Sequence, residues 1–136
     1  MTVATPPTLR DIEALADAAW RGIPARLRAM TDDILIRVEE FPDAEVCRHM
    51  ALDSPFDLLG LYQGVAISER GVMDSVPDID MIFLYRRPML EYWCERDIDL
   101  GRLVRHVLIH EIGHHFGFSD ADMAALEEEA EAEAED

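Results

Sequence analysis

Residues 110–120 contain the most informative group of chemically active side chains, arranged as His-Glu-x-x-His-x-x-Gly-x-x-Asp. Residues four apart lie on the same face of a helix, so His110 and His114 can each direct a ring nitrogen at one cation. Zinc suits such imidazole ligands and their tetrahedral arrangement. Glu111 lies beside the first ligand, where it can act as the general base for water bound to the ion. The spacing therefore predicts a zinc centre of the catalytic kind.

The third ligand is expected from the residues that follow the motif helix. Gly117 can adopt the positive φ that ends a helix and reverses the chain. Asp120 would then return towards the two histidines. Three protein ligands plus water are typical of a catalytic zinc site, whereas a fourth protein ligand closes a structural one. We expect one zinc ion held by His110, His114 and Asp120, although manganese, iron or cobalt suit the same donors.

The segment before the motif has the helical periodicity that this arrangement needs. Apolar residues recur at helical spacing over residues 100–112, which places the motif on the last turns of a helix. His106 lies one turn before His110 and is expected to be near the ligands or partly exposed, rather than a fourth ligand. His115 points about 100° away from His114 and is expected to pack elsewhere or to face solvent. The alternative is an ordinary amphipathic helix that happens to carry histidines, which the fixed offsets of the motif disfavour.

The composition places these residues in one acidic domain. The chain has 136 residues, with 29 acidic and 12 basic side chains and a formal net charge of −17. This charge disfavours binding to nucleic acid, and no apolar stretch reaches the roughly 18 residues of a membrane span. The N-terminus lacks the basic region and apolar core of a secretion signal. We expect a cytoplasmic protein in which Cys47 and Cys94 are free thiols.

Periodicity and turn residues predict a single α+β unit around the motif helix. Further helices are expected from residue 9 towards Gly22, with Thr8 as its N-cap, and over residues 25–30, 43–50 and 88–94. Strands are expected over residues 34–40, 58–63 and 79–85, with a loop or hairpin over residues 66–77.

The C-terminal segment is strongly acidic. Residues 119–136 hold nine acidic side chains and no basic one. The run 126–136 combines good helix formers with self-repulsion. We therefore expect a domain over residues 1–125 and a solvated acidic tail over 126–136. The alternative is an acidic flap over the site or an attractor of cations.

Three segments together resemble the small bacterial zincin-like metallopeptidases: the motif HEIGHHFGFSD, the upstream stretch LLGLYQGVAISERG and the stretch IFLYRRPMLEY. The resemblance extends roughly from the first helix to Asp120. It implies a minimal zincin fold, in which a small mixed sheet of about three strands packs on helices and the motif helix lies near the C-terminus. It also implies that His110, His114 and Asp120 are zinc ligands and that Glu111 is the catalytic carboxylate.

The expected function is hydrolysis of peptide bonds by a zinc-activated water with Glu111 as general base. The substrate would be a peptide or an extended polypeptide segment, paired with an exposed edge of the sheet that strand 79–85 is expected to supply. Tyr62 could stabilise the oxyanion of this reaction, or could be a half-buried strand residue. Two alternatives remain: a non-catalytic metal- or peptide-binding module on the same scaffold, and a regulatory partner that docks through an edge strand and the acidic tail.

Overall fold

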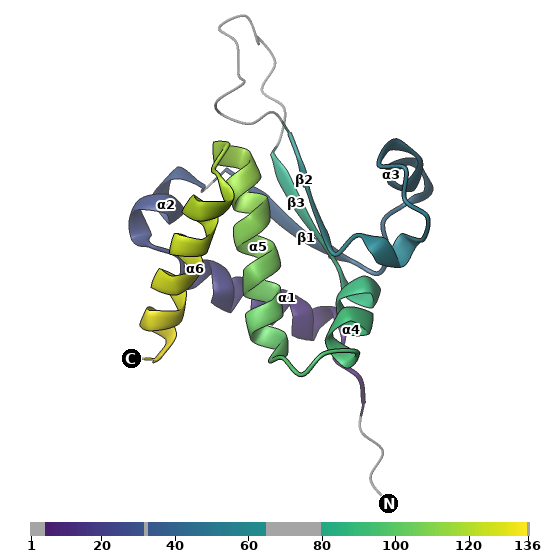
Figure 1. Cartoon of the computed structure of the whole chain (residues 1–136), viewed down its shortest axis with the longest axis horizontal. Helices are drawn as coiled ribbons and strands as arrows, with labels where there is room; N and C mark the ends of the chain where they lie inside the picture. Colours follow the sequence, from purple (N-terminus) through teal and green to yellow (C-terminus); the bar gives the residue numbers. More distant parts are fainter. Residues whose placement is uncertain (1–4, 32, 65–79, 136) are drawn as a thin grey trace, which may run out of the picture.

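The computed structural model describes residues 5–31, 33–64 and 80–135. In Figure 1 a small sheet lies against a long helix, and shorter helices flank both. The expected α+β class with a small mixed sheet is confirmed. The loop or hairpin expected over residues 66–77, and residue 79 at the start of an expected strand, lie outside the described residues.

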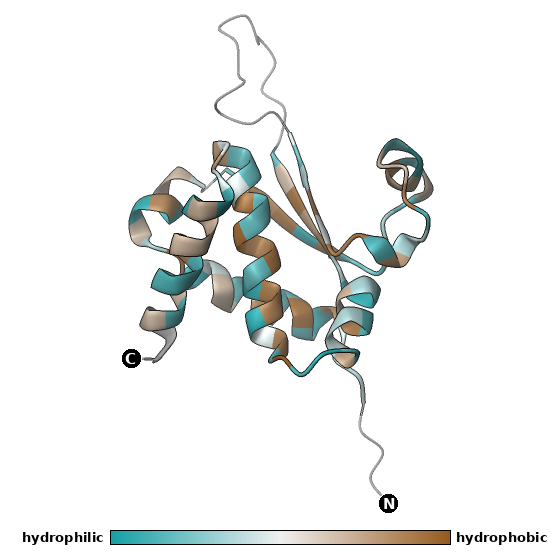
Figure 2. Ribbon diagram, in the orientation of Figure 1, coloured by the Kyte–Doolittle hydropathy of each residue, from teal (hydrophilic) through white to brown (hydrophobic). Residues whose placement is uncertain are grey.

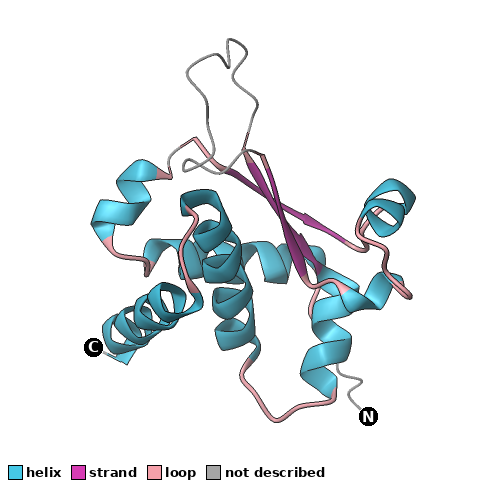
Figure 3. Cartoon of the chain, turned by 45° about the horizontal axis from the view of Figure 1, so that its top comes forward, coloured by secondary structure: helices cyan, strands magenta, loops and turns pink. Residues whose placement is uncertain are grey.

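The expected helices and strands are present, with shifts of a few residues at their ends (Figure 3). The helices are α1 (Leu9–Arg21), α2 (Ala25–Met30), α3 (Ala44–His49), α4 (Arg86–Cys94), α5 (Leu100–Phe116) and α6 (Asp120–Glu135). The strands are β1 (Leu35–Glu39), β2 (Gly60–Gln63) and β3 (Met81–Tyr85), and the 3₁₀ turn η1 (Pro55–Asp57) precedes β2. Helix α4 starts earlier than expected because the first N–H groups of a helix have no partner within it, so Pro88 is tolerated in the first turn.

The sheet has the strand order β1-β3-β2, with β3 parallel to β1 and antiparallel to β2. The expectation that strand 79–85 forms an exposed edge is therefore wrong, because β3 is the central strand. Its sequence Met-Ile-Phe-Leu-Tyr is apolar at every position, which is typical of an inner strand rather than an edge. Among the described strands, β1 and β2 form the edges.

Helices α1 and α5 pack against one another and against the sheet, and their apolar residues form most of the core (Figure 2). Thr8 is the N-cap of α1 as predicted, and it forms a capping box: its hydroxyl accepts a hydrogen bond from the backbone of Asp11 at 3.1 Å, and the Asp11 carboxylate accepts one from the backbone of Thr8 at 2.8 Å. Every described helix is too short or too polar to span a lipid bilayer.

A tight turn connects α5 to α6. Gly117 has the left-handed conformation expected of it, with φ 72° and ψ 30°, and ends α5. Ser119 then caps α6, since its hydroxyl accepts a hydrogen bond from the backbone of Asp122 at 3.2 Å. Helix α6 runs back alongside α5 in the opposite direction (Figure 1).

The acidic C-terminal segment is a packed helix in its described part. Met123, Leu126 and Ala130 are 4%, 8% and 1% exposed, and all three belong to the core. The expectation of a solvated tail from residue 126 therefore does not hold for Leu126 and Ala130. These apolar residues are three and four positions apart, so they form a buried stripe on an otherwise acidic helix.

Candidate active site

Helix α5 carries His110, Glu111 and His114 within two turns, and they differ strongly in burial. Glu111 is 9% exposed, whereas the side chain of His114 is 57% exposed. Strand β2 passes close to this part of α5 at Gly60, where an added Cβ would lie 2.6 Å from Cγ1 of Val107 and 3.5 Å from Cγ of Glu111. The absence of a side chain at residue 60 therefore allows the strand to cover the glutamate.

The surroundings of Glu111 would suit a proton acceptor. Burial raises the pKa of Glu111 above its ordinary value, while the His114 imidazole and a hydrogen bond from the backbone N–H of Tyr62 lower it in part. The Nδ1 atom of His114 lies 3.6 Å from Oε1 of Glu111. A carboxylate with a raised pKa holds an abstracted proton more readily than an exposed one, which is what general base catalysis near neutral pH requires.

His110 is partly buried, and its surroundings favour the neutral ring. Burial and then the neighbouring His106 ring lower the pKa of His110 below 6.5, against smaller opposing effects of Glu127 and Asp120. A neutral imidazole keeps a free lone pair, which binding to a metal requires. The donors on α5, two imidazoles on successive turns beside a buried carboxylate, thus have the chemistry of a zinc site.

The donor atoms of the three expected ligands, His110, His114 and Asp120, do not all lie within 4.8 Å of one another. Asp120 is exposed at the start of α6. Among the described residues, the group of three metal-ligating side chains whose donor atoms all lie within 4.8 Å of one another is His106, His110 and Glu127, not His110, His114 and Asp120.

Sequence reasoning gave no role to Glu127 and only a peripheral one to His106. Oε1 of Glu127 lies 2.5 Å from Nδ1 of His106, and the rings of His106 and His110 are 4.5 Å apart between centroids. The apolar spacing of Met123, Leu126 and Ala130 is the signal that could have located Glu127. It predicts that α6 packs on α5, and Glu127, next to the buried stripe, would then face the histidines.

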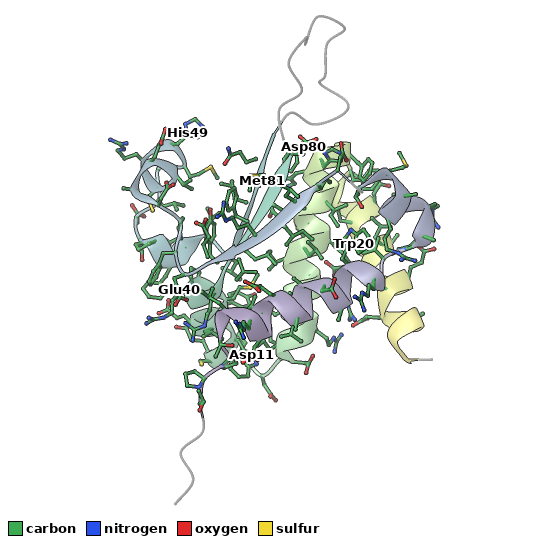
Figure 4. The ribbon with its side chains drawn as sticks, turned by 180° about the vertical axis from the view of Figure 1, so that it is seen from behind. Asp11, Trp20, Glu40, His49, Asp80 and Met81 are labelled. Carbon is green, nitrogen blue, oxygen red and sulfur yellow. The ribbon has the colours of Figure 1, made fainter. Side chains whose placement is uncertain are left out.

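A second polar cluster lies behind the motif, at the ends of β2, β3 and α5. The Tyr62 hydroxyl donates a hydrogen bond to Oδ1 of Asp80 at 3.0 Å and lies 3.0 Å from Nδ1 of His115. Asp80 and His115 are 2% and 1% exposed, and Figure 4 shows Asp80 where β3 begins. The hydroxyl has one hydrogen, so its bond to Asp80 implies that Nδ1 of His115 carries a hydrogen and donates it to Tyr62.

Tyr62 therefore connects the two clusters. Its hydroxyl holds Asp80 and His115, while its backbone N–H bonds to Glu111. The expectation that His115 points away from His114 and packs elsewhere is confirmed by its burial beside Tyr62. The Tyr62 hydroxyl, expected either to face the zinc site or to be half-buried, is thus engaged with Asp80 and His115.

A family model described as zincin-like metallopeptidase matches residues 31–130 of the chain. The matched region includes the whole sheet, α5, the turn at Gly117 and most of α6. No curated protein was found to match the chain.

Proposed function

We propose that this chain, which belongs to the zincin-like metallopeptidase family, hydrolyses peptide bonds as a zinc-dependent enzyme. The observation that supports this most is the arrangement on α5, where two imidazoles one turn apart flank a buried carboxylate with a raised pKa. This combination supplies both cation ligands and a proton acceptor at one place.

His110 and His114 would hold the zinc ion, with Asp120 as the proposed third ligand after a rearrangement of the turn or of the side chain. Asp120 is exposed and stands at the first position of α6, so its side chain is free to change rotamer. When bound, zinc supplies a Lewis acid that polarises the scissile carbonyl and lowers the pKa of water.

Glu111 would move the proton in this reaction. Its carboxylate accepts a proton from the attacking water and passes it to the nitrogen of the leaving amine. The raised pKa of Glu111 supports the second transfer in particular, because the carboxyl must keep the proton until the C–N bond breaks. The hydrogen bond from Tyr62 would keep the carboxylate in one orientation during both transfers.

An extended peptide could pair with the outer edge of β2. This strand is bonded to β3 on one side only, within the described residues, and Gly60 brings it against α5 beside Glu111. Backbone pairing along such an edge binds peptides largely independently of their sequence. It would place a scissile bond near the glutamate.

The experiment that tests this function uses zinc-loaded protein and a library of internally quenched fluorogenic peptides. We expect cleavage that is lost when zinc is removed by a chelator and restored when zinc is added back. His110→Ala should lose most of the zinc bound by the wild type, and His114→Ala should lose the zinc-dependent cleavage. His49→Ala, an exposed histidine on α3 far from α5 (Figure 4), is the matched control and should keep its zinc.

The donor atoms of His110, His114 and Asp120 do not all lie within 4.8 Å of one another, which favours one alternative, a metal- or peptide-binding module without turnover. Zinc binding that depends on His110, without cleavage of any peptide in the library, would select this alternative. Cleavage without any dependence on zinc would exclude both.

A further inference from the structure

Three side chains that can bind a metal meet between α5 and α6: His106, His110 and Glu127. Only His110 belongs to the ligand set expected from the sequence. We propose that His106, His110 and Glu127 form a second zinc-type cation site, which competes with the metallopeptidase centre for His110. The competition rests on the proposed function, because it requires His110 to be a ligand in both sites. The second site itself rests on the geometry of α5 and α6.

The donor atoms of this site are already close together. All three lie within 4.8 Å of one another, and Nδ1 of His106 is 2.5 Å from Oε1 of Glu127. Donors around a tetrahedral zinc ion are about 3.4 Å apart, as bond lengths near 2.1 Å require. Small side-chain rotations would therefore open the site around a cation. Two imidazoles and one glutamate are also a ligand set found in zinc sites that keep an open position.

The site is accessible from solvent. A cavity of about 550 Å³ lies between α6 and the first turns of α5, and both His106 and Glu127 line it. The side chains of His106 and Glu127 are 52% and 28% exposed. A hydrated cation can enter this cavity, and water can complete its coordination.

The alternative is that Glu127 only fastens α6 to α5. Arg102 and Arg105 both pair with Glu131 one turn further along α6, so a ladder of ion pairs joins the two helices. An ion pair, however, needs only His106 and Glu127. The His110 ring lies 4.5 Å from the His106 ring between centroids, which adds a second nitrogen donor. Ion pairing between the two helices does not require this donor.

One histidine cannot serve both sites at the same time. A neutral imidazole has one nitrogen with a free lone pair, since the other carries a hydrogen. A cation held by His106, His110 and Glu127 therefore leaves the metallopeptidase centre with only His114 and Asp120. The second site would thus withhold His110 from the hydrolytic centre, and binding there would reduce the active fraction.

Equilibrium dialysis against Zn²⁺, together with absorption spectra of the Co²⁺-loaded protein, tests this proposal without measuring activity. In His114→Ala/Asp120→Ala, which removes two exposed ligands of the proposed hydrolytic centre, we expect close to one zinc ion per chain to remain. Adding His106→Ala or Glu127→Gln to that variant should weaken zinc binding by at least about tenfold. Loss of a residue that only hydrogen-bonds to a metal ligand already costs about this much, and loss of a ligand should cost more. The wild type should bind one zinc ion, not two.

Matched controls are His49→Ala and Glu128→Gln in the same double variant, and both should leave zinc affinity unchanged. Circular dichroism confirms that each variant is folded. The proposal is overturned if the folded double variant binds no zinc, if its binding survives loss of His106 and Glu127, or if the wild type binds two ions. Peptide cleavage is measured separately, so an inactive protein that shows the predicted binding pattern would refute the proposed function and leave this site standing.

Discussion

Glu111 places a carboxylate at a position only 9% exposed, and burial raises its pKa above the ordinary 4.5. The folded state therefore binds this proton more tightly than the unfolded state does. Below the ordinary carboxyl pKa the contribution of Glu111 to the free energy of unfolding is fully present. It falls as pH rises from the ordinary pKa through the raised pKa of the folded state, and it stays low at higher pH. The ionised carboxylate of Glu111 therefore destabilises the folded protein. The proposed reaction gives a reason for its burial, because it needs a proton acceptor at this position.

Neutralising this side chain should relieve that cost. In metal-free protein, we expect Glu111→Gln to be more stable than the wild type at about pH 7.5 and the difference to shrink towards about pH 4. Thermal melts across this range measure the difference. Glu128→Gln removes one charge at an exposed position and should stay within about 0.5 kcal/mol of the wild type. A Glu111→Gln difference that narrows with rising pH would contradict the raised pKa.

The hydroxyl of Tyr62 should matter for stability because both of its partners are buried. In Tyr62→Phe, Asp80 and His115 lose a hydrogen-bond partner, so we expect a loss of about 1–3 kcal/mol in the free energy of unfolding. Chemical denaturation measures this loss. Tyr92→Phe is the control, since the Tyr92 hydroxyl makes no hydrogen bond within the described residues and its ring contact with Arg96 is kept. Equal effects of the two variants would show that the network contributes little.

For individual residues, the sequence predicted the positions that the geometry of one helix determines. It did not predict the contacts that depend on packing between helices. The positions of His110, Glu111 and His114 relative to one another follow from the rise and turn of one helix. The neighbours of Asp120 and Glu127 depend instead on how α6 packs on α5, which the motif does not encode. The placement of Asp120 as a ligand stays a prediction.

At the scale of elements, α6 should act as a structural helix. Leu126→Ala should lower the free energy of unfolding by about 2 kcal/mol, because the residue is 8% exposed and its truncation leaves a cavity between α6 and the core. Denaturant titration measures the change. Glu128→Ala, two residues along on the exposed side of the same helix, is the control and should have an effect below about 0.5 kcal/mol. A negligible effect of Leu126→Ala would restore the solvated tail expected from the acidic composition.

The helices and strands were largely predictable, but their order in the sheet was not. Thr8 and Gly117 mark helix ends by local chemistry, and the structure places each as a cap. The central position of β3 comes from pairing with strands far away in the sequence. The continuous apolar sequence of β3 is typical of an inner strand, and it is evidence against an exposed edge.

At the scale of the whole molecule, the excess of acidic residues should make stability depend on salt. The chain has 29 acidic and 12 basic residues, and most of the described ion pairs are exposed and therefore individually weak. Raising the NaCl concentration from about 0.01 to 0.15 M shortens the screening length from about 30 to 8 Å, which weakens the net repulsion. We expect Tm to rise over this range. A fall in Tm would show that the ion pairs between α5 and α6 outweigh the overall repulsion.

The central claim is that Glu111 is the proton acceptor of a zinc-dependent peptide hydrolase, and one comparison tests it most directly. Wild type and Glu111→Gln are loaded with zinc to the same measured content, and their rates are compared on one peptide that the wild type cleaves. We predict that Glu111→Gln keeps its zinc and its fold while its turnover falls by about 100-fold or more, the usual contribution of a general base. Equal turnover at equal zinc content would contradict the account.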